Sequence, residues 1–171
     1  MKVTITGTKG IARAISNSLP DCEVTAVSKS TGYDIVQWQS WIHEFYEHDF
    51  FINNAQEHYH QAEILVHLAQ HWQSQANKTI INIGSTVANY PRSHGCDSKF
   101  DLYRSGKRLL QDSFDQLVRN CECRLVLINP GPTDTDMMKG KNVAKMTPET
   151  VAQHVVWCIA HREIKRLDLW L

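Results

Sequence analysis

Residues 4–16 have the sequence TITGTKGIARAIS, in which a short run of β-formers leads through two glycines into a run with helical spacing of apolar residues. Ile11, Ala14 and Ile15 fall on one face of that helix. The glycines at positions 7 and 10 allow a tight turn and a close approach of the backbone to a phosphate group. Ala12 takes the place of a third glycine, so the stretch alone predicts a strand–turn–helix unit that either binds a nucleotide or simply turns.

Strand-like and helical segments alternate along the rest of the chain. Strands are predicted at residues 2–6, 23–28, 33–36, 49–53, 78–84, 123–129 and 166–171. Helices are predicted at 10–19, 36–47, 57–75, 101–119 and 148–162, the last with Thr147 as N-cap, and a loop is predicted at 86–100. This order predicts the α/β class, with a Rossmann-like, doubly wound parallel sheet and helices on both faces, in a single domain over residues 1–171. Ligands of such sheets bind at the carboxyl ends of the strands, which here are Gly7, Ser28, Asn53, Ser85 and Asn129.

The composition is that of a globular protein without net charge. Of the 171 residues, 42% are hydrophobic and 21% charged, and 18 Lys and Arg balance 18 Asp and Glu. No charge excess is present to attract nucleic acid or an anionic membrane, and no apolar run is long enough to span a bilayer. The N-terminus has no signal-peptide pattern, and the five cysteines include one close pair, Cys121 and Cys123. We therefore expect a cytoplasmic protein with reduced thiols.

Nine histidines are many for this length. His67 and His71 are at i, i+4 spacing on a predicted helix, which binds a metal when a third ligand is present. The sequence offers no evident third ligand. We therefore predict no metal site and expect these histidines on a polar face or a subunit interface.

The end of the second predicted strand indicates which nucleotide would fit. An acidic residue usually meets the ribose of NAD at this point, whereas AVSKSTGYDI places Ser28 and Lys29 there. Lys9 lies in the glycine loop that precedes the first helix. Two cations beside one ribose would favour a 2′-phosphate and hence NADP. The alternative is that both lysines are ordinary surface charges.

Tyr103 and Lys107 are at i, i+4 spacing in DLYRSGKRLL, residues 101–110. On a helix this spacing places both side chains on one face. A phenol has an ordinary pKa of about 10, and a neighbouring ammonium group lowers that pKa. The pair is therefore interpreted either as a tuned proton donor or as two solvated side chains.

Together, these motifs resemble those of the short-chain dehydrogenase/reductase family. They occur in the family's order, as TGTKGIA at 6–12, YDI at 33–35, INNAQ at 52–56, IINIGS at 80–85, YRSGK at 103–107 and NPGPTDT at 129–135. The resemblance implies an NADP-dependent oxidoreductase that interconverts a carbonyl and an alcohol of a small molecule by hydride transfer, with NAD(H) as an alternative cofactor. It also implies a homodimer or homotetramer packed through residues 57–75 and 101–119.

The resemblance carries a role to each matching residue. Tyr103 would be the general acid or base, Lys107 would lower the Tyr103 pKa and bind the nicotinamide ribose, and Ser85 would bind the substrate oxygen. The cofactor would be held at its pyrophosphate by Gly7, Lys9, Gly10 and Ile11; at its 2′-phosphate by Ser28 and Lys29; at its adenine by Asp34 and Ile35; at its adenosine ribose by Asn53 and Ala55; and at its nicotinamide by Pro130, Gly131, Thr133 and Thr135.

The chain also departs from the family pattern. It is much shorter than is usual, and only DMMKGKNVAK follows Thr135 where a substrate-covering lid is expected. Gln56 replaces a motif glycine, and the family's catalytic asparagine would fall near Glu57 or His58, with His58 as its candidate replacement. These departures favour a second hypothesis, a catalytically weak or inactive NADP(H)-binding sensor or regulatory protein. A third hypothesis, a flavodoxin-like or phosphate-binding domain without a dinucleotide, leaves YRSGK and NPGPTDT unexplained.

Overall fold

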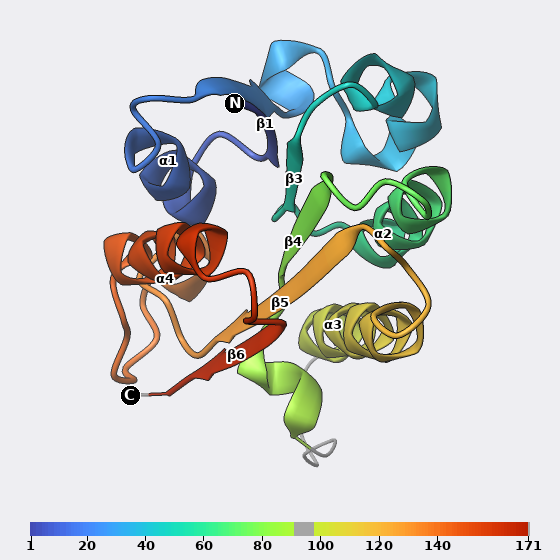
Figure 1. Ribbon diagram of the computed structural model, residues 1–171. Helices are drawn as coiled ribbons and strands as arrows, with labels where there is room; N and C mark the ends of the chain where they lie inside the picture. The colour runs from blue at the N-terminus through green and yellow to red at the C-terminus, as the bar shows by residue number, and fades with distance from the viewer. Residues whose placement is uncertain (91–97, 171) are drawn as a thin grey trace.

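A parallel β-sheet forms the centre of the molecule in the computed structural model, which describes residues 1–90 and 98–170 (Figure 1). Within those residues the sheet has six strands in the order β2-β1-β3-β4-β5-β6, and every pair is parallel. The strands are β1 Lys2–Thr6, β2 Glu23–Val27, β3 Phe50–Asn53, β4 Thr79–Ile83, β5 Arg124–Pro130 and β6 Arg166–Leu169. The predicted α/β class and doubly wound parallel sheet are confirmed.

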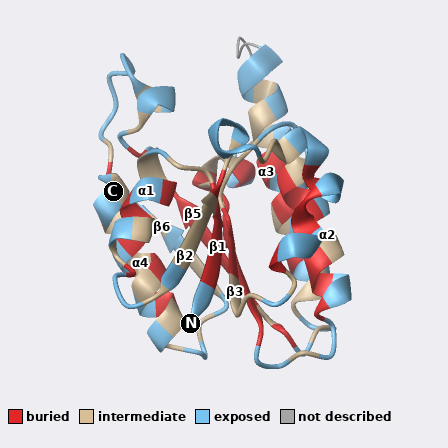
Figure 2. Cartoon of the chain, turned by 90° about the horizontal axis from the view of Figure 1, so that it is seen from above, coloured by how far each residue is buried: buried red, intermediate tan, exposed pale blue. Residues whose placement is uncertain are grey.

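Helices cover both faces of the sheet. Helices α1 (Gly10–Asn17) and α4 (Pro148–Ala160) lie together on one face, and α2 (His60–His71) and α3 (Ser98–Leu117) lie together on the other (Figure 1). Burial in Figure 2 follows this arrangement, because the helix sides that face the sheet are buried while their outer sides are exposed. The central strand β4 is buried at every residue, as expected for a parallel strand covered from both sides.

Two hydrophobic clusters fill the two interfaces. Ile81 and Val155 belong to the cluster beneath α1 and α4, whereas Ile80 and Leu110 belong to the cluster beneath α2 and α3. Neighbouring residues of β4 thus point to opposite faces, as the pleat of a strand requires. The second cluster also takes in Trp72, the largest fully buried side chain.

The region between β2 and β3 differs from the prediction. The brief strand predicted at 33–36 is wrong, and the helix predicted at 36–47 is replaced by two short 3-10 helices, η2 (Ile35–Ser40) and η3 (Ile42–Phe45). A further 3-10 helix, η1 (Lys29–Thr31), precedes them directly after β2. The cause is local, since the Asp34 carboxylate accepts the backbone N–H of Val36 at 3.0 Å and caps η2. An Asx cap of this kind competes with extended backbone.

Other boundaries differ by a few residues. The helix predicted at 57–75 is shorter, and His58 just before it has a positive φ of 48°. The loop predicted at 86–100 begins instead with the 3-10 helix η4 (Thr86–Asn89), α3 starts at Ser98, and residues 91–97 lie outside the described residues. Thr147 does cap α4, because its hydroxyl accepts the Thr150 N–H at 3.1 Å.

The strand order places the candidate site. The chain passes from β1 outward to β2 and then returns to β3 on the other side of β1. Ligands of open α/β sheets bind at the carboxyl edge beside such a reversal. In the parts of the chain that the structure describes, no helix is both long and apolar enough to cross a lipid bilayer, and no cluster of three His, Cys, Asp or Glu side chains could hold a metal ion.

Candidate active site

The glycine loop lies at this reversal and is closely packed on both sides. Gly7 and Gly10 both have positive φ, 106° and 53°, which side chains rarely adopt. A Cβ on Gly7 would lie 3.0 Å from Nδ2 of Asn54, and a Cβ on Gly10 would lie 3.1 Å from Cγ2 of Thr135. Lys9, the N-cap of α1, makes no side-chain capping bond among the described residues, so the first helical N–H groups are left for another acceptor.

A pocket of about 420 Å³ opens beside the loop, at the ends of β1 and β2. Five of the predicted cofactor residues line it together, namely Ser28, Lys29, Asp34, Ile35 and Ala55. Tyr33, Val36 and Trp41 give the same pocket an apolar wall. A flat, mostly apolar group with polar edges, such as a purine nucleoside, suits this lining.

Hydroxyl groups and one cation gather at the mouth of this pocket. Ser28 Oγ lies 2.8 Å from Ser30 Oγ and accepts a hydrogen bond from Thr8 Oγ1 at 3.3 Å. The Lys29 ammonium is 87% exposed and lies 3.3 Å from the Asp34 carboxylate. The Val36 N–H and, to a smaller extent, Lys29 lower the pKa of Asp34. These groups can bind an anion together with a nucleoside.

Lys107 is buried, and the hydrogen-bond acceptors that its amine has among the described residues are neutral oxygens. Its side chain projects from α3 toward the end of β4, where Nζ donates to Ile83 O and to Gln61 Oε1, each at 2.8 Å. Only 3% of the residue is exposed. Burial alone lowers the pKa of Lys107 from 10.5 to about 7.

Tyr103 lies beside Lys107 on the same helix face, as expected, and Nζ is 5.7 Å from the centroid of the phenol ring. The expected electrostatics differ, however. Burial raises the pKa of Tyr103, and a hydrogen bond with Ser85 opposes that rise in part. Lys107 does not supply the lowering, because its amine lies over the face of the ring and burial disfavours its own charge. Among the described residues, Ser85, which also caps η4, is thus the one that favours the phenolate.

Gln61 is the residue of this cluster that the sequence analysis missed. It is fully buried on α2, and its amide Nε2 donates to Asn53 O at 2.6 Å and to Ile83 O at 3.0 Å. The asparagine slot expected near Glu57 or His58 holds no group that touches Lys107 in the described contacts. A signal did exist, because Gln61 places a polar side chain on the same helix face as the apolar stripe, one turn before its first members. The stripe consists of Ile64, Leu65, Leu68 and Trp72.

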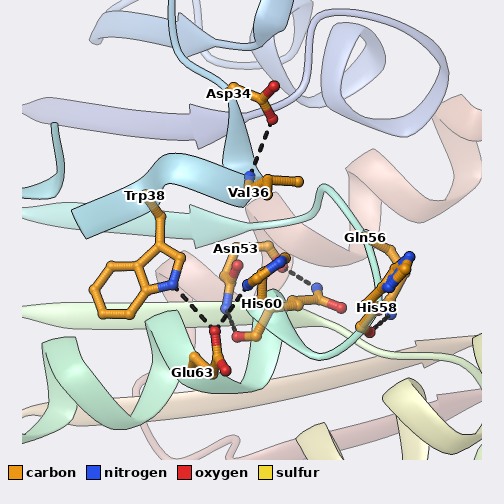
Figure 3. A network of polar contacts seen from close by, with 9 residues as sticks. Asp34, Val36, Trp38, Asn53, Gln56, His58, His60 and Glu63 are labelled. Atoms are coloured by element: carbon orange, nitrogen blue, oxygen red, sulfur yellow. Dashed lines mark hydrogen bonds and ion pairs between the residues drawn. The ribbon is translucent and has the colours of Figure 1, made fainter. Parts of the chain in front are cut away.

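Asn53 is placed differently from the ribose contact that the resemblance implies. Its side chain, labelled in Figure 3, is fully buried. It donates to Gln61 O at 2.8 Å and to Asn82 Oδ1 at 3.0 Å. The next residue, Asn54, lies at the glycine loop instead and donates to Thr6 O at 3.0 Å. In the INNAQ motif, therefore, the first asparagine joins strands and helix, and the second borders the loop.

The segment 54–58 connects the pocket with Lys107. Ala55 and Glu57 line the pocket, and Gln56 Nε2 donates to His58 O at 2.5 Å (Figure 3). His58 O in turn packs on Gly106, where a Cβ would come within 2.4 Å of it. The glycine in YRSGK thus lets this short segment rest on α3 directly beside Lys107.

The segment after β5 closes the other side of the loop. Pro130 ends β5, Gly131 N donates to Leu169 O at 3.0 Å, and Thr133 Oγ1 donates to Gly131 O at 3.0 Å. Thr135 follows, in contact with Gly10. The structure therefore brings most of the predicted residues to one edge of the sheet, with Lys9 exposed at its rim and Ile11 half-buried on α1.

The predicted histidine pair does not face the site. His67 Nε2 lies 2.6 Å from the Tyr46 hydroxyl, and His71 stacks on the Tyr46 ring with centroids 3.7 Å apart. These contacts fix α2 against the segment after η3.

Comparison with known proteins identifies the fold. No protein-family model matches the chain, and no curated protein sequence does. Among solved structures, 3-ketoacyl-(acyl-carrier-protein) reductase from Brucella melitensis, complexed with NADH, is similar with a TM-score of 0.77 and 15% identity over 98% of this chain and 96% of that one. A short chain dehydrogenase from Burkholderia cenocepacia, in complex with NADP, gives a TM-score of 0.76 and 18% identity over 98% and 95% of the two chains. Serine dehydrogenase from Escherichia coli gives 0.68 and 19% over 99% and 97%. The chain has the fold of short-chain dehydrogenases and reductases.

Proposed function

We propose that this chain is a short member of the short-chain dehydrogenase/reductase family, an NADP(H)-dependent oxidoreductase that interconverts a carbonyl and an alcohol of a small molecule. One observation carries the proposal. A pocket lined by Ser28, Lys29 and Asp34 and a cluster of Ser85, Tyr103 and Lys107 lie along the same edge of the sheet, joined by the segment 54–58. The fold shared with NADH- and NADP-bound dehydrogenases supports it.

The residues present fit a dinucleotide. The glycine loop is open at the N–H groups of α1, so Gly7, Gly10 and Ile11 would hold the pyrophosphate. The apolar wall of the pocket and Asp34 would hold the adenine, and Thr133 and Thr135 would border the nicotinamide. When bound, the nicotinamide supplies or accepts the hydride.

The protein's own part is to position the substrate oxygen and to move one proton. The hydroxyls of Ser85 and Tyr103 lie within hydrogen-bond distance of each other. A substrate oxygen bound beside them would accept from Tyr103, and also from Ser85 once the Ser85 hydroxyl turns from the phenol toward it. In the reducing direction the carbonyl carbon gains a hydride and its oxygen takes the Tyr103 proton, which is later replaced from water. Because burial raises the pKa of Tyr103, the phenol is the form that stands ready to donate.

The preference for NADP(H) rests on the cation and hydroxyl groups at the rim of the pocket. Lys29 and the hydroxyls of Ser28 and Ser30 can bind a phosphate there, and Lys29 would exchange its contact with the Asp34 carboxylate, now at 3.3 Å, for that phosphate. Titration of NADPH and NADH into the purified protein, followed by nucleotide fluorescence, tests this preference. Tighter binding of NADH would contradict it.

Substituting Tyr103 with Phe tests the chemistry. The ring keeps its place but loses the proton, so turnover with a responsive carbonyl substrate should fall by about 100-fold or more while NADPH affinity stays nearly unchanged. Stopped-flow absorbance of NADPH at saturating substrate measures the first quantity, and fluorescence titration the second. Full turnover in Tyr103→Phe would refute the role of the phenol.

A second candidate is a binding protein without turnover. It is favoured by Lys107, whose amine is already bound to two protein oxygens and is nearly inaccessible. A panel of aldehydes, ketones and quinones assayed with NADPH separates the candidates, since rapid oxidation with any of them excludes a purely binding role.

A further inference from the structure

The amide of Gln61 occupies a position that packing alone would give to an apolar residue. It lies in the apolar stripe of α2, facing the sheet, and is fully buried. Burying an amide without hydrogen-bond partners destabilises a protein. A methionine would have a similar shape and need no partner, so the glutamine has to be explained by what its polar atoms contact.

Those contacts fix the orientation of the amide. Nε2 donates to Asn53 O at 2.6 Å and Ile83 O at 3.0 Å, which turns Oε1 toward Lys107 Nζ at 2.8 Å. A flipped amide would set its oxygen against two carbonyl oxygens and its NH₂ against an ammonium group. The peptide of Gln61 is also tied down, because its carbonyl accepts from Asn53 Nδ2 at 2.8 Å.

The Gln61 side-chain oxygen orients the amine of Lys107. An ammonium group has three N–H donors, and Gln61 Oε1 and Ile83 O occupy two of them. When the amine is protonated, the third N–H has no acceptor among the described residues and is left for a ligand next to Tyr103. Two acceptors that cannot move therefore determine where the amine lies and in which direction its last donor can point.

Among the described residues, no charged side chain contacts the Lys107 amine in place of these neutral acceptors. On α2, His60 and Glu63 pair with each other at 2.8 Å, and in the segment packed on Gly106, His58 and Glu57 pair at 3.1 Å. On its own helix the neighbouring titratable group is Tyr103. Burial is the sole cause of the lowered pKa of Lys107, so its protonated form depends on neutral acceptors.

We propose that Gln61 is the positioning residue for Lys107, and that its side-chain oxygen holds the lysine amine in the place and orientation from which it serves a nucleotide bound beside Tyr103. The assignment to a nucleotide rests on the proposed function. The contact between Gln61 and Lys107 and its effect on the amine do not.

The test compares Gln61→Met with Gln70→Met, a control on the exposed side of the same helix. The readout is the pKa of Lys107, followed by NMR of ¹⁵N-labelled lysine side chains and assigned with Lys107→Met. Loss of a hydrogen bond to the charged form should lower the pKa of Lys107 by about one unit or more in Gln61→Met and leave it unchanged in the control. An unchanged Lys107 pKa together with a lower melting temperature would reduce Gln61 to a structural role and overturn the proposal.

If Gln61→Met does not fold, Gln61→Glu provides a second test of the effect of residue 61 on Lys107. A carboxylate retains the acceptor for Lys107 but cannot donate to Asn53 O and Ile83 O, so we expect a raised Lys107 pKa in a less stable protein. A Lys107 pKa at or below that of the wild type would overturn the proposal. Neither Lys107 titration needs a nucleotide. If the wild type binds neither NADPH nor NADH, the proposed function is wrong. The proposal for Gln61 is then still decided by the pKa of Lys107 in the two variants.

Discussion

At the scale of single residues, the site depends on two glycines where polar groups press against the backbone. Gly84 lies between the end of β4 and Ser85, and a Cβ on it would lie 1.9 Å from Asn129 Oδ1. Asn129 cannot easily retreat, because it is fully buried and its Nδ2 donates to Asp168 Oδ1 at 2.7 Å. Gly106 plays the same part between α3 and His58. Close approach, not backbone freedom, explains both positions, since neither has positive φ.

Substituting Gly84 with Ala should therefore lower the free energy of unfolding by about 1–3 kcal/mol, the usual range for overpacking. If the loss comes from a steric clash with the Asn129 side chain, shortening that side chain should restore part of the stability. In Gly84→Ala/Asn129→Ala the new methyl group takes the space that the amide leaves. The double variant should be more stable than the sum of the two single changes allows, as measured by urea unfolding. Simple additivity in this cycle would contradict the steric explanation.

At the scale of elements, a residue of β5 forms hydrogen bonds with carbonyl groups at the C-terminal end of α4 and in the turn that follows. The Arg124 guanidinium donates through Nη2 to Cys158 O at 2.6 Å, His161 O at 2.9 Å and Ile164 O at 3.1 Å. The last carbonyls of a helix have no partner within the helix. One arginine therefore terminates α4 and holds the turn that leads into β6, the strand beside the nicotinamide end of the candidate site.

Replacing Arg124 with Met should leave these carbonyls without their donor, and we expect a loss of about 1.5–3 kcal/mol in unfolding free energy, the range for hydrogen bonds to charged groups. Hydrogen exchange should also accelerate in the last turn of α4 and in β6 before it does elsewhere. Arg119→Met, in the exposed turn that follows α3, is the control. Uniform acceleration across the sheet would contradict a local fastening role.

The elements also differ in how well the sequence predicts them. Buried strands such as β4 were predictable, because continuous apolar runs bounded by polar residues have few other solutions. The 33–36 strand failed because Asp34 caps a 3-10 turn, and this competes with alternation over so short a stretch.

In the site, strand-end residues such as Ser28 and Ser85 were found by their place in the order of elements. The Gln61–Lys107 and Gly106–His58 contacts were not, because they join separate segments through side-chain directions that only packing sets.

At the scale of the whole molecule, burial of ionisable groups couples the candidate site to global stability. Lys107 has a pKa of about 7 in the folded protein and 10.5 as its ordinary value. Between these values the unfolded chain binds more protons than the folded one, so stability rises with pH. Cys123 and Cys158 act oppositely. Burial raises their pKa values from 9.0 to about 12 and about 11, so above about pH 9 the unfolded chain loses protons first and stability falls.

We therefore expect stability to increase from pH 7 to about pH 9 and to decrease above it. The increase between pH 7 and about pH 9 is caused by Lys107 and should be absent in Lys107→Met. In this range the free energy of unfolding of the wild type should therefore rise, relative to that of Lys107→Met, by up to about 1.4 kcal/mol per pH unit. Urea unfolding at half-unit steps of pH, with a reductant to keep the thiols reduced, measures that slope, and Lys165→Met, an exposed lysine, is the control. The slope and not the offset is decisive, because removing the amine also removes its two hydrogen bonds. Parallel curves for wild type and Lys107→Met would mean that the amine keeps its proton when the protein folds, and burial would then no longer account for its state beside Tyr103.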